Sequence, residues 1–308
     1  MKRISLLMRR SAVGERHWQW RSPCDNFPSM ERERTIAKPV SVSGIGLHSG
    51  AKTFLTLKPA TPGSGITFFR SDLNPSLPIP AHIDYVGDAR LATTLRRGEV
   101  EVATVEHLLA AVYSLEVDNL EAWLEGPEVP SGDGSARIFV DLITAAGLKV
   151  QDRDRSIFSI PYPLEAINHE ARIAAYPEPG GDLLLEFLIA YPRLKVPEQT
   201  FRIQLSPDHF RREIASARTY GFLEGLSGLE AEGKGKGGSL ENAILMSDGK
   251  VVNPEGLRFP EELVRHKILD LIGDLALLGR RISGRVVAQY SGHLLNHQLV
   301  REMRRLLI

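Results

Sequence analysis

Two kinds of hydrophobic pattern recur along this chain, and both occur in its first half and again in its second half. Short apolar or alternating runs typical of strands lie at residues 54–57, 65–69, 119–124, 157–160, 171–175 and 183–189. Longer apolar stretches typical of helices lie at residues 107–115, 136–146, 207–216 and 260–278. Because strands and helices are grouped in this way twice, the pattern predicts an α+β fold with two domains.

Changes in composition along the chain predict where the domains begin and end. The charged run at residues 151–155 is the natural linker, so we expect one domain over residues 32–152 and another over residues 153–308. Residues 1–31 are rich in arginine, and we expect an extension that is disordered, or untranslated if Met30 is the true initiator. An organelle transit peptide is the alternative, whereas the apolar stretch near the start is too short for a signal-peptide core.

One helical stretch, residues 260–278, carries polar groups where few are expected. Its apolar residues surround much of the predicted helix, so the helix should be buried. His266, Asp270 and Asp274 stand four residues apart and therefore point along one face. Buried carboxylates are costly unless they are paired, hydrogen-bonded or bound to a metal, and an imidazole and a carboxylate at this spacing can share a zinc ion. A satisfied core histidine beside a salt-bridged aspartate is the alternative interpretation.

A second element offers the missing metal ligand. Residues 103–112 indicate the start of a helix with Thr104 as its N-cap, which places Glu106 and His107 in the first turn of a mostly buried helix. A catalytic zinc has three protein ligands and an open fourth position. His107 and the histidine–aspartate pair of the other helix would supply two nitrogens and one oxygen, while Glu106 would accept a proton from water. Alternatively, Glu106 is an ordinary first-turn acid favoured by the helix dipole.

The third element lies near the C-terminus. A strand-like run at residues 285–288 is followed closely by Ser291, Gly292 and His293, which predicts a turn at the end of a strand. A histidine there can donate a proton to a leaving amine or face an oxyanion, and Asp274 can hold its other ring nitrogen. Without the other two elements, a histidine on a surface turn would be the default interpretation.

Composition limits the kinds of partner that the chain can have. Lys plus Arg and Asp plus Glu are equal at 38 each, so no net charge draws the chain onto nucleic acid or anionic lipid. The single cysteine, Cys24, excludes an intramolecular disulfide and a cysteine-rich zinc site, which fits a reducing cytoplasm. No apolar run is long enough to span a bilayer, so we expect no nucleic-acid partner and no stable membrane insertion.

Short motifs spread over the chain resemble one known family. The main ones are Thr-Val-Glu-His-Leu-Leu at 104–109, Arg-His-Lys-Ile-Leu-Asp-Leu-Ile-Gly-Asp-Leu at 265–275 and Ser-Gly-His-x-x-Asn at 291–296. Further matches lie at residues 44–50, 133–136, 217–222, 237–243 and 253–259. In this order and spacing the motifs resemble the UDP-3-O-acyl-N-acetylglucosamine deacetylases of lipid A biosynthesis, from about Arg34 to the C-terminus.

This resemblance implies a role for each matching residue. The matches are His107, His266 and Asp270 as zinc ligands, Glu106 as general base, His293 as general acid, Asp274 as its orienting partner, Lys267 near the reacting centre and the polar groups of the substrate, and Thr219 as a hydroxyl that helps hold the oxyanion. The resemblance also implies two similar two-layer sandwich domains of the ribosomal protein S5 domain 2-like type, with zinc between them.

The implied activity is zinc-dependent removal of acetate from the 2-acetamido group of a UDP-linked, 3-O-acylated glucosamine. This is the committed step of lipid A biosynthesis in the cytoplasm of a Gram-negative-type bacterium, and we expect a monomer. Residues 221–226, beyond Thr219, are either core or part of an apolar passage for the acyl chain.

The chain departs from the family pattern at two positions. Tyr220 stands where Phe is commoner, and Tyr290 stands where many members carry Lys or Arg, which puts one diphosphate contact in doubt. The alternatives are a zinc amidase acting on another N-acyl sugar nucleotide, or a non-catalytic protein whose halves are clamped by a metal.

Overall fold

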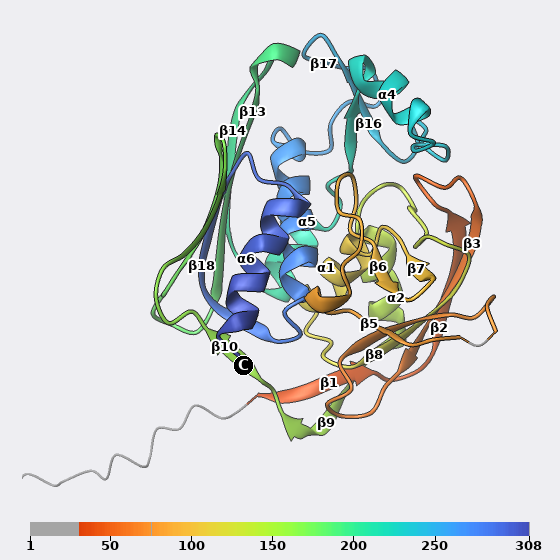
Figure 1. Cartoon of the computed structure of the whole chain (residues 1–308), viewed down its shortest axis with the longest axis vertical. Coiled ribbons are helices and arrows are strands. Elements are labelled where there is room, and N and C mark those ends of the chain that lie inside the picture. The colour runs from red at the N-terminus through yellow and green to blue at the C-terminus, as the bar shows by residue number, and fades with distance from the viewer. Residues whose placement is uncertain (1–30, 75, 308) are drawn as a thin grey trace, which may run out of the picture. The chain divides into compact units, whose positions relative to one another are not determined.

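Two larger β-sheets frame the residues that the computed structural model describes, which are 31–74 and 76–307 (Figure 1). The first sheet has the order β2-β3-β8-β4-β5, and its strands are β2 (Val40–Ile45), β3 (Lys52–Pro59), β4 (Ile66–Arg70), β5 (Ile79–Pro80) and β8 (Leu120–Glu125). The second has the order β11-β12-β18-β13-β14, with β10 also paired to β18. Its strands are β10 (Ile157–Ser159), β11 (Leu164–Asn168), β12 (Ala171–Tyr176), β13 (Leu183–Tyr191), β14 (Val196–Gln204) and β18 (Arg281–Gln289).

Both sheets follow the same plan. In the first, β8 lies between antiparallel β3 and parallel β4; in the second, β18 lies between antiparallel β12 and parallel β13. One helix precedes and one follows each of these central strands. They are α1 (Glu106–Ser114) and α2 (Arg137–Ala146) around β8, and α5 (Glu262–Ala276) and α6 (His293–Arg305) around β18. This mixture of sheets and helices agrees with the predicted α+β class.

The four longer helices lie between the two sheets (Figure 1). α5 packs on β13 and β14, α6 packs on β11 and β12, and α1 packs against α5. Apart from Lys267 and Ala276, every residue of α5 is buried, as its apolar circumference predicted. On the strands the apolar side chains alternate, so that Leu55 and Leu57 of β3 face the core. α5 is thus a buried helix that has neighbours on several sides.

The remaining elements are short. They are β1 (Arg32–Ile36) paired with β9 (Leu148–Asp154), β6 (Leu95–Arg97) paired with β7 (Val100–Val102), and the sheet β15 (Tyr220–Phe222), β16 (Ile244–Ser247) and β17 (Lys250–Val251). The short helices are η2 (Ile83–Tyr85), η3 (Pro192–Leu194), α3 (Pro207–His209), η4 (Phe210–Ile214), η5 (Leu223–Gly225) and α4 (Leu226–Ala231). Among the described residues, no helix is long and apolar enough to cross a membrane.

Most of the elements expected from the hydrophobic pattern are present, but two expectations need correction. The charged run 151–155 is not an irregular linker, because most of it belongs to β9, where Gln151 is buried and bonds Asn119 and Ala60. The helix expected at 207–216 is one turn of α-helix, α3, followed by the π-helical turn η4. Cys24 and almost all of the expected extension at residues 1–31 lie outside the described part of the chain.

Candidate active site with a metal centre

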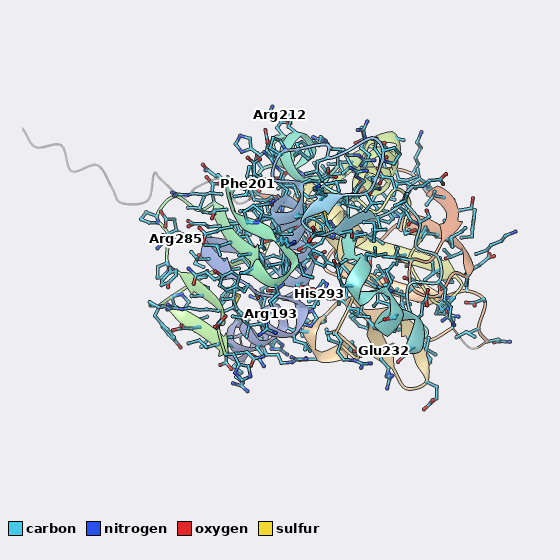
Figure 2. The ribbon with its side chains drawn as sticks, turned by 90° about the horizontal axis from the view of Figure 1, so that it is seen from above. Arg193, Phe201, Arg212, Glu232, Arg285 and His293 are labelled. Carbon is cyan, nitrogen blue, oxygen red and sulfur yellow. The ribbon has the colours of Figure 1, made fainter. Side chains whose placement is uncertain are left out.

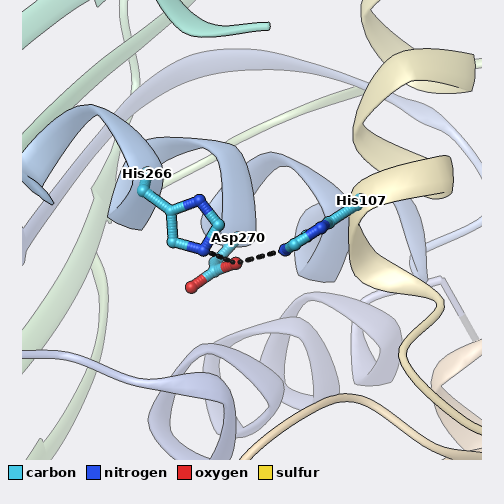
Figure 3. Close-up of side chains that lie close together, drawn as sticks. All are labelled: His107, His266 and Asp270. Atoms are coloured by element: carbon cyan, nitrogen blue, oxygen red, sulfur yellow. Dashed lines mark ion pairs between the residues drawn. The ribbon is translucent and has the colours of Figure 1, made fainter. Parts of the chain in front are cut away.

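Three side chains that can bind a metal converge where α1 meets α5. His107 is the second residue of α1, and His266 and Asp270 lie one turn apart on α5. The Nε2 atoms of His107 and His266 lie 3.6 Å and 3.3 Å from the same oxygen, Oδ1 of Asp270 (Figure 3). All three side chains are buried. The structure thus brings together the three residues singled out in the sequence.

The close approach of α1 and α5 depends on Gly273. A Cβ atom at this position would lie 2.1 Å from the backbone carbonyl oxygen of Glu106. A side chain has no room there, so glycine allows α5 to touch the first turn of α1. This contact sets His107 opposite His266 and Asp270.

Hydrogen bonding leaves the appropriate atom of His266 free for a metal ion. Its Nδ1 lies 3.1 Å from the carbonyl oxygen of Ala217, to which it must donate, so Nε2 carries the free lone pair. Burial lowers the pKa of His266 to about 4, which keeps the ring neutral at neutral pH. Two imidazole nitrogens and one carboxylate oxygen form a donor set that zinc accepts, so these residues fit the metal.

Lys267 holds the second oxygen of Asp270. Its Nζ donates to Oδ2 at 2.6 Å, which leaves Oδ1 facing the two histidines. Burial disfavours the charged amine, but the carboxylate of Asp270 outweighs this effect and raises the pKa of Lys267. Lys267 therefore lies beside the centre, as expected, although its side chain is not part of the cavity wall described below.

Glu106 is the first residue of α1 and lies beside the metal donors. Its side chain is buried, and burial raises the pKa of its carboxyl group. Oε2 accepts a hydrogen bond from the backbone N–H of Thr93 at 3.0 Å, and Oε1 lies 3.8 Å from Nε2 of His293. A carboxylate held by one oxygen keeps the other available as a proton acceptor.

The expectation that Thr104 is the N-cap of this helix is wrong. Val105 precedes α1 without a side-chain cap, and Thr104 has a φ of 57°, outside the extended region that an N-cap adopts. Its hydroxyl donates instead to Oε1 of Glu128 at 2.7 Å, and Glu128 also accepts from the backbone N–H groups of His48 and Ser49. A tertiary contact thus replaces the local cap and holds the chain just before Glu106.

His293 lies beside the metal donors, with its Nε2 4.0 Å from Oδ2 of Asp270. The chain bends after β18, as expected, but His293 is the first residue of α6, a helix that the sequence analysis missed. In the view from above it lies between Arg285 of the second sheet and Glu232 (Figure 2). Its Nδ1 donates to Oδ2 of Asp274 at 2.8 Å. Burial alone would lower the pKa of His293, but Asp274 outweighs it and raises the pKa to about 9, so the ring is charged at neutral pH.

Asp274 accepts hydrogen bonds from three further side chains. Thr93 Oγ1 and His297 Nε2 approach Oδ1 at 2.7 Å and 2.9 Å, and Asn296 Nδ2 approaches Oδ2 at 2.8 Å. Burial opposes the charge of Asp274, but these donors and the two histidines hold its pKa well below the usual range. Because its oxygens are taken, Asp274 is not a free metal ligand, although it lies close to His293 and His297.

Thr93 and His297 also belong to this site, although the sequence motifs did not indicate them. His297 follows His293 by four residues, so the helical spacing that identified His266 and Asp270 would have indicated it once α6 was recognised. Thr93 lies in an irregular segment between η2 and β6 and gave no signal.

One cavity of about 410 Å³ joins these groups. His107, His266, Asp270, Glu106, His293 and Thr219 all lie in its wall. Thr219 is fixed there by its backbone, whose N–H donates to Gly134 at 2.7 Å and whose carbonyl accepts from Ile244 at 2.8 Å. Leucines form much of the remaining wall: Leu47, Leu91, Leu226, Leu229, Leu240 and Leu245. Charged groups at one place and leucines elsewhere suit a ligand with a polar reacting group and an apolar part.

The two departures from the family pattern lie in different surroundings. Tyr220 keeps an aromatic ring at this position, and the ring packs edge-on against His266 with centroids 6.1 Å apart. Its hydroxyl bonds the hydroxyl of Tyr191 at 2.6 Å. Tyr290 is exposed and lines a separate cavity with Arg90, next to His293.

A three-donor metal site, a buried carboxylate and a charged histidine on one cavity wall are the parts of a metal-dependent hydrolase. Residues 33–305 match the family model described as UDP-3-O-acyl N-acetylglycosamine deacetylase, and the chain belongs to this family. The resemblance stated from the motifs is thereby confirmed.

Similar proteins come from several bacteria, and each is named UDP-3-O-acyl-N-acetylglucosamine deacetylase. The one from Myxococcus xanthus is 44% identical over 90% of this chain and 87% of its own length. The one from Citrifermentans bemidjiense is 43% identical over 88% of each chain. The one from Coxiella burnetii is 39% identical over 89% of this chain and 90% of its own.

Proposed function

We propose that this chain is a zinc-dependent deacetylase in lipid A biosynthesis. It hydrolyses the N-acetyl group of UDP-3-O-acyl-N-acetylglucosamine to give UDP-3-O-acyl-glucosamine and acetate. The observation that carries this proposal is the placement of Glu106 and His293 on the same cavity wall as the His107, His266 and Asp270 donor set. Membership of the deacetylase family and the names of the similar proteins support the choice of substrate.

We assign the metal to zinc, held by the three converging donors. When bound, zinc supplies Lewis acidity, which lowers the pKa of water and polarises a carbonyl oxygen. Glu106 accepts the proton of the attacking water on the oxygen that Thr93 does not hold. His293, charged through Asp274, donates a proton to the nitrogen of the departing amine. The hydroxyl of Thr219 donates to the oxyanion that develops on the acetyl group.

Two further groups complete the proposed site. Lys267 fixes Asp270 and so holds one metal ligand in place beside the reacting centre. The leucines of the cavity wall receive the 3-O-acyl chain, with Leu226 coming from the segment 221–226.

We also propose the finer architecture, two similar sandwich domains over residues 32–152 and 153–308. The repeated strand order and the repeated helix–strand–helix sequence around β8 and β18 support this division. α1 and α5 then occupy equivalent places in the two domains and meet at the metal donors. Since one chain supplies every donor, the site needs no second subunit, and we propose a monomer that acts on nucleotide sugar in the cytoplasm.

The alternative of a non-catalytic metal clamp predicts a closed site with a fourth protein ligand. In the described part of the chain, the group around His107 contains three residues that can bind a metal. The nearest extra candidate is His293. Its Nδ1 donates to Asp274, and its Nε2 lies 4.0 Å from Oδ2 of Asp270 rather than near Oδ1, the oxygen that His107 and His266 share. The geometry therefore favours an open catalytic site.

A substrate comparison tests the proposed function. Acetate release is measured with UDP-3-O-acyl-N-acetylglucosamine, with UDP-N-acetylglucosamine that lacks the acyl chain, and with a differently N-acylated sugar nucleotide. We expect the acylated N-acetyl substrate to react with much the highest kcat/KM, because it fills the leucine-lined cavity. Equal or faster reaction of another N-acyl sugar nucleotide would establish the alternative amidase instead.

A further inference from the structure

Thr93 bonds both Glu106, the group assigned as base, and Asp274, the partner of the group assigned as acid, although it does not line the cavity. Its backbone N–H donates to Oε2 of Glu106 at 3.0 Å. Its hydroxyl donates to Oδ1 of Asp274 at 2.7 Å. One fully buried residue thus joins the carboxylate assigned as base to the carboxylate that holds His293.

His297 is the second buried group at this place that has no assigned role. It lies on α6, one turn beyond His293, and it is 1% exposed. Its Nε2 lies 2.9 Å from Oδ1 of Asp274 and 3.2 Å from Oγ1 of Thr93, whereas its Nδ1 is buried without any hydrogen-bond partner.

The surroundings of His297 determine its tautomer. An ionised carboxylate only accepts hydrogen bonds, so the hydrogen must sit on Nε2. A hydrogen on Nδ1 as well would leave a buried donor without an acceptor, which is costly. Nε2 therefore carries a hydrogen, and His297 acts as a fixed donor to Asp274.

The donors around Asp274 saturate its carboxylate. The two oxygens of an ionised carboxylate offer about four lone-pair sites. Thr93 and His297 approach Oδ1, while His293 and Asn296 approach Oδ2. A carboxylate held on both oxygens cannot turn away from His293, whereas loss of a donor on Oδ1 would allow it to rotate.

We propose that Thr93 and His297 are positioning residues for proton transfer: together they fix Asp274 against His293, and Thr93 also fixes Glu106. For its kinetic consequence the proposal rests on the proposed deacetylase function. For its geometry it rests on the hydrogen bonds alone.

Nuclear magnetic resonance of protein with isotope-labelled histidine tests the geometry without any enzyme assay. The imidazole signals report which nitrogen of His297 carries the hydrogen, and loss of one set in His297→Gln assigns them. We expect hydrogen on Nε2, the nitrogen that faces Asp274. An Nε2 without hydrogen would overturn the proposal even if the protein proved to be an active deacetylase.

Paired variants test the kinetic consequence. Thr93→Val and His297→Met remove the donors, whereas Thr93→Ser and His297→Gln retain a donor at about the same place. A hydrogen bond to a charged group contributes about 1.5–3 kcal/mol. We therefore expect kcat to fall about 10- to 100-fold in Thr93→Val and in His297→Met. Thr93→Ser and His297→Gln should largely retain the parental kcat. KM and bound zinc should stay close to the parent values.

Ser114→Ala is the matched control, since Ser114 is equally buried and its hydroxyl has no hydrogen-bond partner. It should leave kcat unchanged. The positioning role would be overturned if Thr93→Val and His297→Met kept the parental kcat. It would also be overturned if the conservative variants, Thr93→Ser and His297→Gln, lost as much kcat as Thr93→Val and His297→Met. If the parent chain releases no acetate, the proposed function fails, and the tautomer of His297 decides the geometry separately.

Discussion

Two histidines on one cavity wall are held in opposite protonation states by their neighbours. Burial dominates at His266, lowers its pKa to about 4, and leaves a neutral ring that can bind a metal. At His293 burial acts in the same direction, but Asp274 outweighs it and raises the pKa to about 9. The roles of ligand and proton donor thus follow from the partner of each ring rather than from the residue type.

Adjacent residues of α1 should respond differently to substitution. Glu106→Gln removes the proton acceptor but no metal ligand, so zinc should remain while kcat falls about 10²–10⁴-fold. His107→Ala removes a ligand, so bound zinc and activity should fall together. Metal analysis and initial rates on the purified variants decide this. Loss of zinc in Glu106→Gln would make Glu106 a ligand instead, and full zinc in His107→Ala would remove His107 from the metal site.

The pH dependence of kcat/KM should be bell-shaped. Glu106 acts when ionised, so activity should rise with pH as its carboxyl group loses its proton. Because burial raises the pKa of Glu106, this acidic limb should lie at a higher pH than the usual pKa of a glutamate. His293 acts when protonated, and Asp274 raises its pKa to about 9, so activity should fall as the pH rises past that region. The two limbs belong to the coupled site rather than to single residues.

His293→Gln tests the assignment of the basic limb. It should lower the maximum and alter the basic limb, while the acidic limb persists. Asp274→Ala should act in the same direction but less strongly, because Asp274 orients and supports the imidazolium. A bell that keeps both limbs and its height in His293→Gln would assign the proton donor to another group.

The residues of the site could be predicted where they recur at helical spacing within one short segment of the sequence. His266, Asp270 and Asp274 share one face of a helix, so spacing alone brought them together. Thr93 could not be found in this way. It reaches Asp274, which is 181 positions away in sequence, only through the folded chain.

Among the secondary-structure elements, the crossing of α1 and α5 is the critical contact. Gly273→Ala would place a Cβ 2.1 Å from the carbonyl oxygen of Glu106, and the two helices would have to separate. We expect a loss of about 1–3 kcal/mol in the free energy of unfolding and weaker zinc binding. Thermal unfolding and metal content measure both effects.

Gly228→Ala provides the control for Gly273→Ala. Gly228 is also a helical glycine, in α4, but a Cβ there meets no atom within 4 Å. Alanine should therefore be neutral or slightly stabilising at that position. Unchanged stability and zinc binding in Gly273→Ala would show that the helix crossing tolerates a side chain.

Elements were predictable where the apolar pattern was strong. α5 and β13 were expected within a few residues of their observed limits. α6 was not predicted because it begins directly after the Ser-Gly turn signal, although Leu295, Leu299 and Met303 form an amphipathic pattern within it. The prediction of Thr104 as an N-cap was wrong because its hydroxyl bonds Glu128, which is distant in sequence, instead of a backbone N–H in the first turn of α1.

On the scale of the whole molecule, the metal donors join the two halves of the chain. His107 comes from the first half, while His266 and Asp270 come from the second. The repeated strand order explains why α1 and α5 meet, but the sequence has no visible repeat that would have predicted it. The motifs identified the family, whereas the pairing of the strands required the structure.

Acetate release measured against bound zinc tests the central claim most directly. The chain is stripped with a chelator, zinc is added back in steps, and hydrolysis of UDP-3-O-acyl-N-acetylglucosamine is followed at each step. We predict negligible activity without zinc, and a linear rise that ends at one zinc per chain, because we assign the metal to a single donor set, His107, His266 and Asp270. Undiminished acetate release from the zinc-free chain, or no release from a chain that holds one zinc, would contradict the account.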